Sequence, residues 1–422
     1  MADPSCFVFI QLPGTFEWAV CGRLAVREVG RDAFIGTFVY GESYLRRRNV
    51  APLDQFHLPL SDRPREVTRL KGIPGALRDA SPDAWGRRVI QAKLNRPDAD
   101  ISELDYLLNG PDDGAGNLRF APTSSVPGAS RPFNRTHQLQ ALVDAAQKLE
   151  EDGRLPQEVL EQLEPGTSMG GARPKVTVED QQAIWLAKLP EKTDRWNFQR
   201  IEYATLELAR AAGLNVCSTR IEKVGARDAL MLRRFDREWN PDAKAYARYG
   251  LVSGLTVLDA EDGYTGRERW SYLLLADELR RWSSEPDEDR LELFRRMVFN
   301  AMVTNNDDHP RNHALLQKDG KWRLSPAYDI VPAPMVSQER RDLALQVGDF
   351  GRAASVYNLV SQPGVFGLSQ QEALAEVDRM RLVVVGWQDI FKQHGVSALD
   401  IEHMAGAMLP ASFSRTEPPQ AV

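Results

Sequence analysis

Cysteine is scarce in this sequence of 422 residues. The three cysteines, Cys6, Cys21 and Cys217, are odd in number and far apart, and none has the close spacing of a zinc site. This pattern excludes a fold held together by a disulfide framework. It favours a protein whose cysteines stay reduced in the cytoplasm.

Long apolar runs are also missing. None approaches the roughly 18–20 residues that are needed to cross a bilayer. The opening MADPSCFVFIQLPG has no basic segment before its short apolar stretch. We therefore expect no membrane span, no signal peptide and a cytoplasmic location.

Positive charge is not in excess, because the formal net charge is −6. A protein that holds nucleic acid by bulk electrostatics alone is usually basic. We therefore expect DNA contact only indirectly, through a partner. The one basic cluster, Arg46-Arg47-Arg48, is more typical of a solvated turn than of a DNA contact.

The length exceeds what one ordinary core supports, and we expect three parts: residues 1–130, 131–240 and 241–422. The first part is predicted to be β-rich and then helical. Its clearest elements are a strand over Phe34–Tyr40 and a helix over Pro82–Leu94, for which Ser81 is a plausible cap.

The second part, residues 131–240, contains a loop, strands and a helix. The loop Glu164–Arg173 is rich in glycine and precedes two strands, Lys175–Val178 and Ala183–Leu189. The helix Phe198–Ala212 follows, with Gly213 just past its end. The third part is predicted to be mostly helical, and its apolar residues over 290–303 recur at helical spacing. This order suits a two-lobed phosphotransferase.

An acidic loop follows the helix predicted over 290–303. It reads NNDDHPRN, from Asn305 to Asn312. The carboxylate of Asp307 can orient a substrate hydroxyl and accept its proton, and an amide oxygen at Asn312 can hold Mg²⁺. This is the spacing of a kinase catalytic loop. The alternative is an acidic surface turn, in which Asp and Asn only bend the chain.

Three further features fit the same chemistry. Asp329 in AYDIVPA is flanked by apolar residues, and a carboxylate in such surroundings needs a partner, for which a metal ion would serve. An ordinary turn carboxylate is the alternative. Lys188 lies in an apolar strand and needs a partner, for which a nucleotide phosphate or the helical Glu202 would serve; a lysine that reaches solvent is the alternative. Gly170 and Gly171 let a backbone loop approach an anion, but a flexible loop would look the same.

The motifs SMGGARPK, AKLP, RRFDREWN, NNDDHPRNH and SPAYDIVPAP, in this order, resemble those of the HipA family of bacterial toxin kinases. SPDAWGRR and DDGAGNLRF resemble the N-terminal region of that family. The resemblance covers about residues 15–410. It implies an α+β, two-lobed protein-kinase-like fold with an extra β-rich N-terminal subdomain and a mainly helical C-terminal lobe.

The resemblance also implies roles for individual residues. Asp307 would be the catalytic base, and Asn312 and Asp329 would hold Mg²⁺. The other implied ATP contacts are the phosphate loop Gly170, Gly171, Ala172, Arg173, Pro174 and Lys175, the phosphate-binding Lys188, the hinge Arg233, Arg234 and Phe235, and the pocket residues His309 and Tyr328. Arg233 replaces an acidic hinge residue of the best-known member, so only backbone hinge contacts carry over.

A regulatory site and partners follow from the same resemblance. Ser168 matches the family's autophosphorylation serine, and a phosphate there would add charge that competes with ATP for the loop amides. The implied function is the toxin of a toxin–antitoxin pair, with a HipB-like DNA-binding antitoxin as partner. Aminoacyl-tRNA synthetases are typical protein substrates.

Three other functions stay open at this point. A small-molecule phosphotransferase would share the Asp…Asn…Asp arrangement. A metal-dependent hydrolase could use Asp307, Asp308, His309 and His313, but Pro310 interrupts helical spacing between the histidines. A non-catalytic repressor partner needs none of these residues.

Two residues of the helix expected over Pro82–Leu94 could face a partner. We expect instead that Trp85 packs in the core and that Asp83 supplies a negative charge at the helix end.

Overall fold

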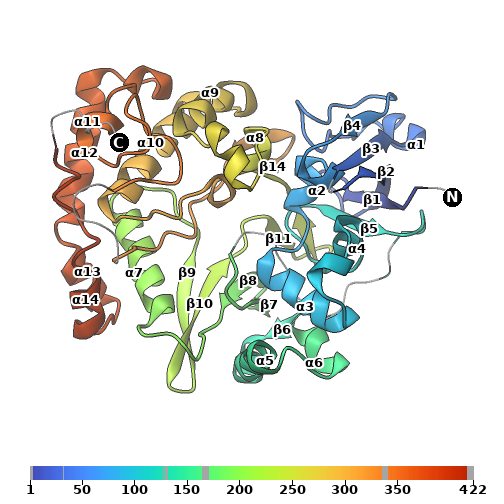
Figure 1. Ribbon diagram of the computed structural model, residues 1–422, viewed down its shortest axis with the longest axis horizontal. Helices are drawn as coiled ribbons and strands as arrows, with labels where there is room; N and C mark the ends of the chain where they lie inside the picture. Colours follow the sequence, from blue (N-terminus) through green and yellow to red (C-terminus); the bar gives the residue numbers. More distant parts are fainter. Residues whose placement is uncertain are drawn as a thin grey trace. The chain divides into compact units, whose positions relative to one another are not determined.

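The computed structural model describes residues 3–31, 33–126, 128, 132–163, 171–334 and 341–415 (Figure 1). The chain divides into two compact units. The first comprises Met1–Lys192, Met231–Thr256 and Leu315–Lys321, and the second comprises Thr193–Leu230, Val257–Ala314 and Trp322–Val422. The expected boundaries at residues 130 and 240 stay a prediction.

A five-stranded sheet opens the first unit, in the order β4-β3-β2-β1-β5. Each strand pairs antiparallel with its neighbour. The strand expected over Phe34–Tyr40 is confirmed as β3, where alternate residues up to Tyr40 are buried. The strands are β1 Ser5–Gln11, β2 Trp18–Gly30, β3 Ala33–Tyr40, β4 Arg65–Val67 and β5 Leu118–Ala121.

Short helices accompany this sheet in the first unit. They are α1 Glu42–Leu45, α2 Gly75–Asp79, α3 Ala84–Leu94, α4 Glu103–Leu108, α5 Leu139–Asp152 and α6 Gln157–Gln162. The N-cap of α3 is Asp83, not the expected Ser81, because the Asp83 carboxylate accepts a hydrogen bond from the Gly86 N–H at 2.9 Å. Trp85 is fully buried, so its expected packing role is confirmed.

A second five-stranded sheet has the order β6-β7-β8-β10-β9. Its strands are β6 Asn134–Arg135, β7 Lys175–Asp180, β8 Ala183–Lys188, β9 Thr219–Val224 and β10 Arg227–Arg233. The expected hairpin is confirmed: β7 and β8 pair antiparallel, and Lys175 lies opposite Lys188. Gln181 and Gln182 form the turn with φ values of 48° and 60°, which suit a two-residue hairpin loop.

Short strands lie on both sides of residue 240, although mostly helix was expected beyond it. β11 Arg237–Asn240 and β12 Ala245–Arg248 form a hairpin. A three-stranded sheet has the order β13-β14-β15, with β13 Gly250–Ser253, β14 Ala314–Lys318 and β15 Lys321–Leu324. Of these, only the strand near Trp322–Leu324 was expected.

Helices dominate the second unit. They are α7 Phe198–Ala211, α8 Gly254–Val257 at the boundary of the units, α9 Tyr272–Trp282, α10 Pro286–Met302, α11 Val356–Leu359, α12 Gln370–Val384, α13 Trp387–Gln393 and α14 Ala398–Met404. Helix α10 begins ahead of the expected Arg290, because proline suits the first helical turn and the three acidic residues after it favour a helix N-terminus. Its buried face includes Phe294, Met297 and Val298.

Within the described ranges, no helix combines the length and the apolar character that a membrane crossing requires.

Candidate functional site

The acidic loop begins where α10 ends, and hydrogen bonds fix it from its buried side. The Asn305 amide donates to Asn300 Oδ1 at 3.1 Å, and the Asn300 amide donates to the Tyr272 hydroxyl at 2.9 Å. Thr304 has a φ of 52° and donates its hydroxyl proton to the Ala407 carbonyl. Tertiary contacts therefore hold the start of the loop in a conformation that local propensity does not favour.

The two aspartates of the loop lie in opposite environments. Asp307 is exposed, whereas Asp308 is only 1% exposed. The Tyr272 hydroxyl donates to Asp308 Oδ2 and the Ala344 N–H donates to Asp308 Oδ1, both at 2.6 Å. Burial raises the pKa of the Asp308 carboxyl to about 7. Asp308 therefore organises the loop, and Asp307 is the carboxylate that can meet a substrate.

Asn312 supplies an oxygen atom suited to a hard cation. Its Nδ2 donates to the Asp307 carbonyl at 2.7 Å, so the two predicted site residues lie together. Its Oδ1 is buried and has no hydrogen-bond partner in the described structure. A buried acceptor of this kind is unusual in a folded protein. An amide oxygen is a ligand that Mg²⁺ accepts, so the residue fits the expected metal.

Asp329 is held beside this loop by bonds on both sides of it. The Tyr328 hydroxyl donates to the Arg311 carbonyl at 2.8 Å, and the Ala333 N–H donates to the Thr304 carbonyl at 3.0 Å. Asp329 itself is half-buried and has a φ of 57°. A left-handed backbone costs a non-glycine residue about 1 kcal/mol or more, so its surroundings impose it. The segment around Asp329 is thus fixed against the loop that carries Asp307 and Asn312.

The two histidines of the loop do not resemble a metal site. The His309 ring accepts a hydrogen bond from the Arg311 N–H through Nδ1 at 3.2 Å. His313 is buried against the Tyr272 ring, and burial lowers its pKa to about 3, which keeps it neutral. Among the described residues, no group of three or more His, Cys, Asp and Glu side chains could hold a metal. The hydrolase alternative therefore gains no support.

The predicted phosphate loop lies in the first unit. Ser168 and Gly170 fall outside the described residues. Lys175 is 2% exposed, and its ammonium donates to Asp83 Oδ2 at 2.7 Å and to the Gly171 carbonyl at 2.9 Å. The Leu189 N–H donates to the Pro174 carbonyl at 2.9 Å, which joins the loop to the end of the β7–β8 hairpin. Ala172 is exposed and Arg173 is half-buried.

The predicted hinge differs from residue to residue. Arg233 is exposed and Phe235 is half-buried, whereas Arg234 is buried against Asp113 and Asp236. These two carboxylates raise the pKa of the Arg234 guanidinium despite its burial. The Arg234 N–H donates to the Ile184 carbonyl at 2.9 Å. The Arg234 side chain thus has a structural role, and an adenine contact would use the backbone of this segment.

The lysine and glutamate of the predicted ion pair belong to different units. Lys188 is half-buried at the end of β8 in the first unit, and Glu202 is 5% exposed on α7 in the second. Their pairing stays a prediction.

Three residues that support the site were not predicted. Tyr272 and Ala344 donate hydrogen bonds to Asp308, and Asp113 accepts one from Arg234. No local sequence pattern marks residues that act through such distant contacts.

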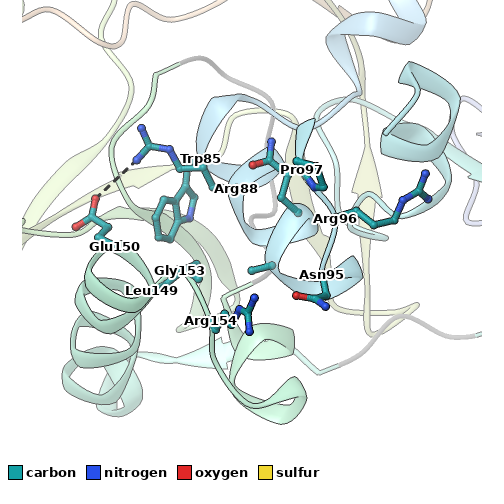
Figure 2. A pocket seen from close by; sticks show the side chains of 11 residues that line it. Trp85, Arg88, Asn95, Arg96, Pro97, Leu149, Glu150, Gly153 and Arg154 are labelled. Carbon is teal, nitrogen blue, oxygen red and sulfur yellow. Dashed lines mark ion pairs between the residues drawn. The ribbon is translucent and has the colours of Figure 1, made fainter. Parts of the chain in front are cut away.

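A cavity of about 470 Å³ in the first unit involves none of the predicted site residues (Figure 2). It lies along α3 and the end of α5, and Figure 2 shows the Arg88 side chain directed towards Glu150, 4.0 Å away. Its lining includes Trp85, Gln91, Asn95, Arg96 and Arg154. The Arg96 guanidinium donates to the Asp100 carbonyl.

Comparisons with known proteins agree with the sequence motifs. The family of HipA-like C-terminal domains matches residues 167–387. A putative kinase of Sinorhizobium fredii, Y4mE, is 24% identical over 380 residues, which are 85% of this chain and 80% of that protein. The serine/threonine-protein kinase toxin HipA of Shewanella oneidensis is 23% identical over 272 residues, 58% of this chain and 60% of that toxin, which is less than two thirds of its length.

A solved structure shows the fold. One chain of the complex of HipA, HipB and operator DNA from Shewanella oneidensis MR-1 matches with a TM-score of 0.67 at 16% identity. The match covers 95% of this chain and 94% of that chain, and it confirms the expected α+β, kinase-like fold class. The family match over residues 167–387 spans more than half of the 422 residues. The chain therefore belongs to the HipA family.

Proposed function

We propose that the protein is an ATP- and Mg²⁺-dependent protein serine/threonine kinase that acts in the cytoplasm as the toxin of a HipA/HipB-like toxin–antitoxin pair. The observation that carries this proposal is the buried, unpartnered Oδ1 of Asn312, whose amide nitrogen donates to the carbonyl of Asp307. A kinase needs a carboxylate at the substrate hydroxyl and an amide oxygen at the metal, five residues apart.

In this proposal the second unit supplies the base and the metal ligands. Asp307 orients the substrate hydroxyl and accepts its proton, and Asn312 and Asp329 hold Mg²⁺, which neutralises charge on the transferring phosphate. The exposure of Asp307 and the bonds that fix the segment around Asp329 to the loop support these roles. His309 and Tyr328 line the nucleotide pocket.

The first unit supplies most of the remaining nucleotide contacts. Gly171–Lys175 provides loop amides for the phosphates, Lys188 contacts the phosphates, and Arg233–Phe235 offers backbone groups to adenine. The position of Lys188 opposite Lys175 supports this arrangement, because Lys188 then lies at the open end of the hairpin, where the loop joins β7.

Transfer from γ-labelled ATP in a cell lysate tests the reaction class. We expect label on a discrete protein band, because the proposed acceptor is a protein serine or threonine. An aminoacyl-tRNA synthetase is the first candidate for that band. Label that appears only in small metabolites would instead identify a small-molecule phosphotransferase.

The proposed regulation is autophosphorylation at Ser168. A phosphate adds about −1.5 to −2 charge beside amides that would otherwise bind ATP. We expect protein phosphorylated at Ser168, as identified by mass spectrometry, to have lost transfer activity. Equal activity of the unmodified and the fully phosphorylated protein would refute this regulation.

The proposed partner is a small HipB-like antitoxin that binds DNA. The net charge of −6 suits a chain that reaches DNA through such a partner. A gel-shift assay of the operator region checks this. We expect a shift with the antitoxin, a further shift when this chain is added, and none with this chain alone. A shift by this chain alone would contradict the indirect contact.

A further inference from the structure

The ammonium of Lys175 is withdrawn from solvent. The side chain is 2% exposed, and Nζ lies 2.7 Å from Asp83 Oδ2, whose own side chain is 3% exposed. A buried charge is stable only with a charged or strongly polar partner, so each group holds the other in place. Lys175 and Asp83 are 92 residues apart in the sequence, and nothing in the local sequence around either residue indicates the pair.

Asp83 is itself fixed by a second bond. Its Oδ1 accepts the Gly86 N–H at 2.9 Å and so caps α3, while Oδ2 accepts from Lys175. The helix behind it is anchored through the fully buried Trp85 and Val89. The carboxylate is therefore presented to Lys175 from the N-terminus of a helix whose inner face is packed in the core.

The same ammonium also holds the loop backbone. Lys175 Nζ donates to the Gly171 carbonyl at 2.9 Å, four residues earlier. Gly171 has a φ of +89°, and a Cβ at this position would stand 3.3 Å from Nζ. A side chain there would be strained by the backbone and crowded by the ammonium. Lys175 thus ties the turn at Gly171 to the helix that carries Asp83.

We propose that Asp83 is a positioning residue for nucleotide binding. Through the Lys175 ammonium it sets the shape of Gly171–Lys175, and hence the direction of the loop N–H groups that would meet the phosphates. Lys175 then holds the loop and does not contact phosphate directly. This inference rests on the proposed kinase function, and it extends the nucleotide site to a helix of the N-terminal region.

The variant Asp83→Asn separates the two possible roles of Lys175. Asparagine still caps α3 through its side-chain oxygen, but it removes the charge that fixes the ammonium. If Lys175 contacted phosphate directly, releasing it from Asp83 would leave nucleotide affinity unchanged or raise it. If Lys175 anchors the loop, the affinity must fall. We expect a fall of at least tenfold.

The experiment measures the affinity of the full-length protein for the magnesium complex of the non-hydrolysable analogue adenylyl-imidodiphosphate. It also measures amide hydrogen exchange over residues 171–178 without nucleotide. The matched control is Glu103→Gln, which removes an equally buried carboxylate from the same unit, where Glu103 pairs with Arg78 and Arg87. The double variant Asp83→Asn/Lys175→Met leaves no buried charge unpaired, so it separates loss of the anchor from general instability.

Weaker nucleotide binding and faster exchange in Asp83→Asn and in the double variant, with both unchanged in Glu103→Gln, would support the inference. Unchanged or tighter binding in Asp83→Asn would overturn it, as would an equal loss in Glu103→Gln. If the wild-type protein does not bind the nucleotide at all, the proposed function fails. Amide hydrogen exchange alone then tests whether the Asp83–Lys175 pair anchors the loop. Faster exchange in Asp83→Asn supports the anchor, and unchanged exchange refutes it.

Discussion

At the scale of single residues, environment separates two neighbouring carboxyl groups. Asp307 is exposed, whereas Asp308 is buried and accepts hydrogen bonds from Tyr272 and Ala344. One aspartate can therefore meet a substrate while the next fixes the loop. The NNDDHPRN motif identified the pair but could not assign these roles, because Tyr272 and Ala344 are each 36 residues away from Asp308.

The raised pKa of Asp308 predicts a pH-dependent stability. The native state keeps the proton up to about pH 7, whereas the unfolded chain releases it near 3.8. The native state therefore binds more protons between these values, and the free energy of unfolding should fall as the pH rises from about 4 to 7. A shift of this size corresponds to a loss on the order of 4 kcal/mol, constant above pH 7.

The variant Asp308→Asn removes this contribution. We expect the difference in unfolding free energy between variant and wild type to shift in favour of the variant as the pH rises from 4 to 7. Urea unfolding of both proteins across this range measures it. Parallel stability profiles would show that Asp308 does not carry the raised pKa.

Replacing Asn312 should affect transfer activity much more than the stability of the fold. Asn312→Leu loses the bond from Nδ2 to the Asp307 carbonyl, a net cost of about 1 kcal/mol, but its Oδ1 has no hydrogen bond to lose. We expect this modest loss of stability together with a fall in transfer rate of more than about tenfold, because the variant lacks the proposed magnesium ligand. Urea unfolding and transfer from labelled ATP measure the two effects.

Asn358 provides the contrast for that prediction. It is fully buried, its Oδ1 accepts from the Phe350 N–H, and its Nδ2 donates to two carbonyl groups. Asn358→Leu should cost clearly more stability than Asn312→Leu, while the folded protein keeps its transfer activity. If Asn312→Leu kept its transfer activity and Asn358→Leu lost it, the support for Asn312 as a metal ligand would be removed.

At the scale of elements, local pattern predicted the long or strongly patterned segments. The strand β3, the β7–β8 hairpin and the helix α7 lie where they were expected. The predictions were wrong where a capping side chain sets a helix boundary or where a strand forms only by pairing with a distant segment. Asp83 and not Ser81 caps α3, and the short strand β13 depends on pairing with β14, more than sixty residues later in the sequence.

The hairpin turn predicts a stabilising substitution. Gln182 is exposed and has a φ of 60°, a conformation that glycine adopts without strain. Gln182→Gly should raise the free energy of unfolding by about 1 kcal/mol. The same change at the exposed Gln371, in α12, should lower it, because glycine weakens a helix. Thermal unfolding compares the two, and destabilisation by Gln182→Gly would refute the strained turn.

At the scale of the whole molecule, the chain is a member of the HipA family whose predicted site residues are divided between two units. The sequence motifs identified these residues by resemblance and suggested their chemistry. They could not reveal the contacts that support them, such as the pair of Asp83 with Lys175 or the burial of Arg234 against Asp113. Such contacts join segments about 90 to 120 residues apart, and only the folded chain brings them together.

The most direct measurement compares Asp307→Asn with the wild-type protein, using transfer from γ-labelled ATP and binding of a non-hydrolysable ATP analogue. The control is Asp389→Asn, which changes another exposed carboxylate of the same unit. We expect Asp307→Asn to bind the nucleotide with nearly wild-type affinity and to lose transfer by more than about a hundredfold, since general base catalysis contributes 10²–10⁴-fold. Full transfer activity in Asp307→Asn would contradict the account.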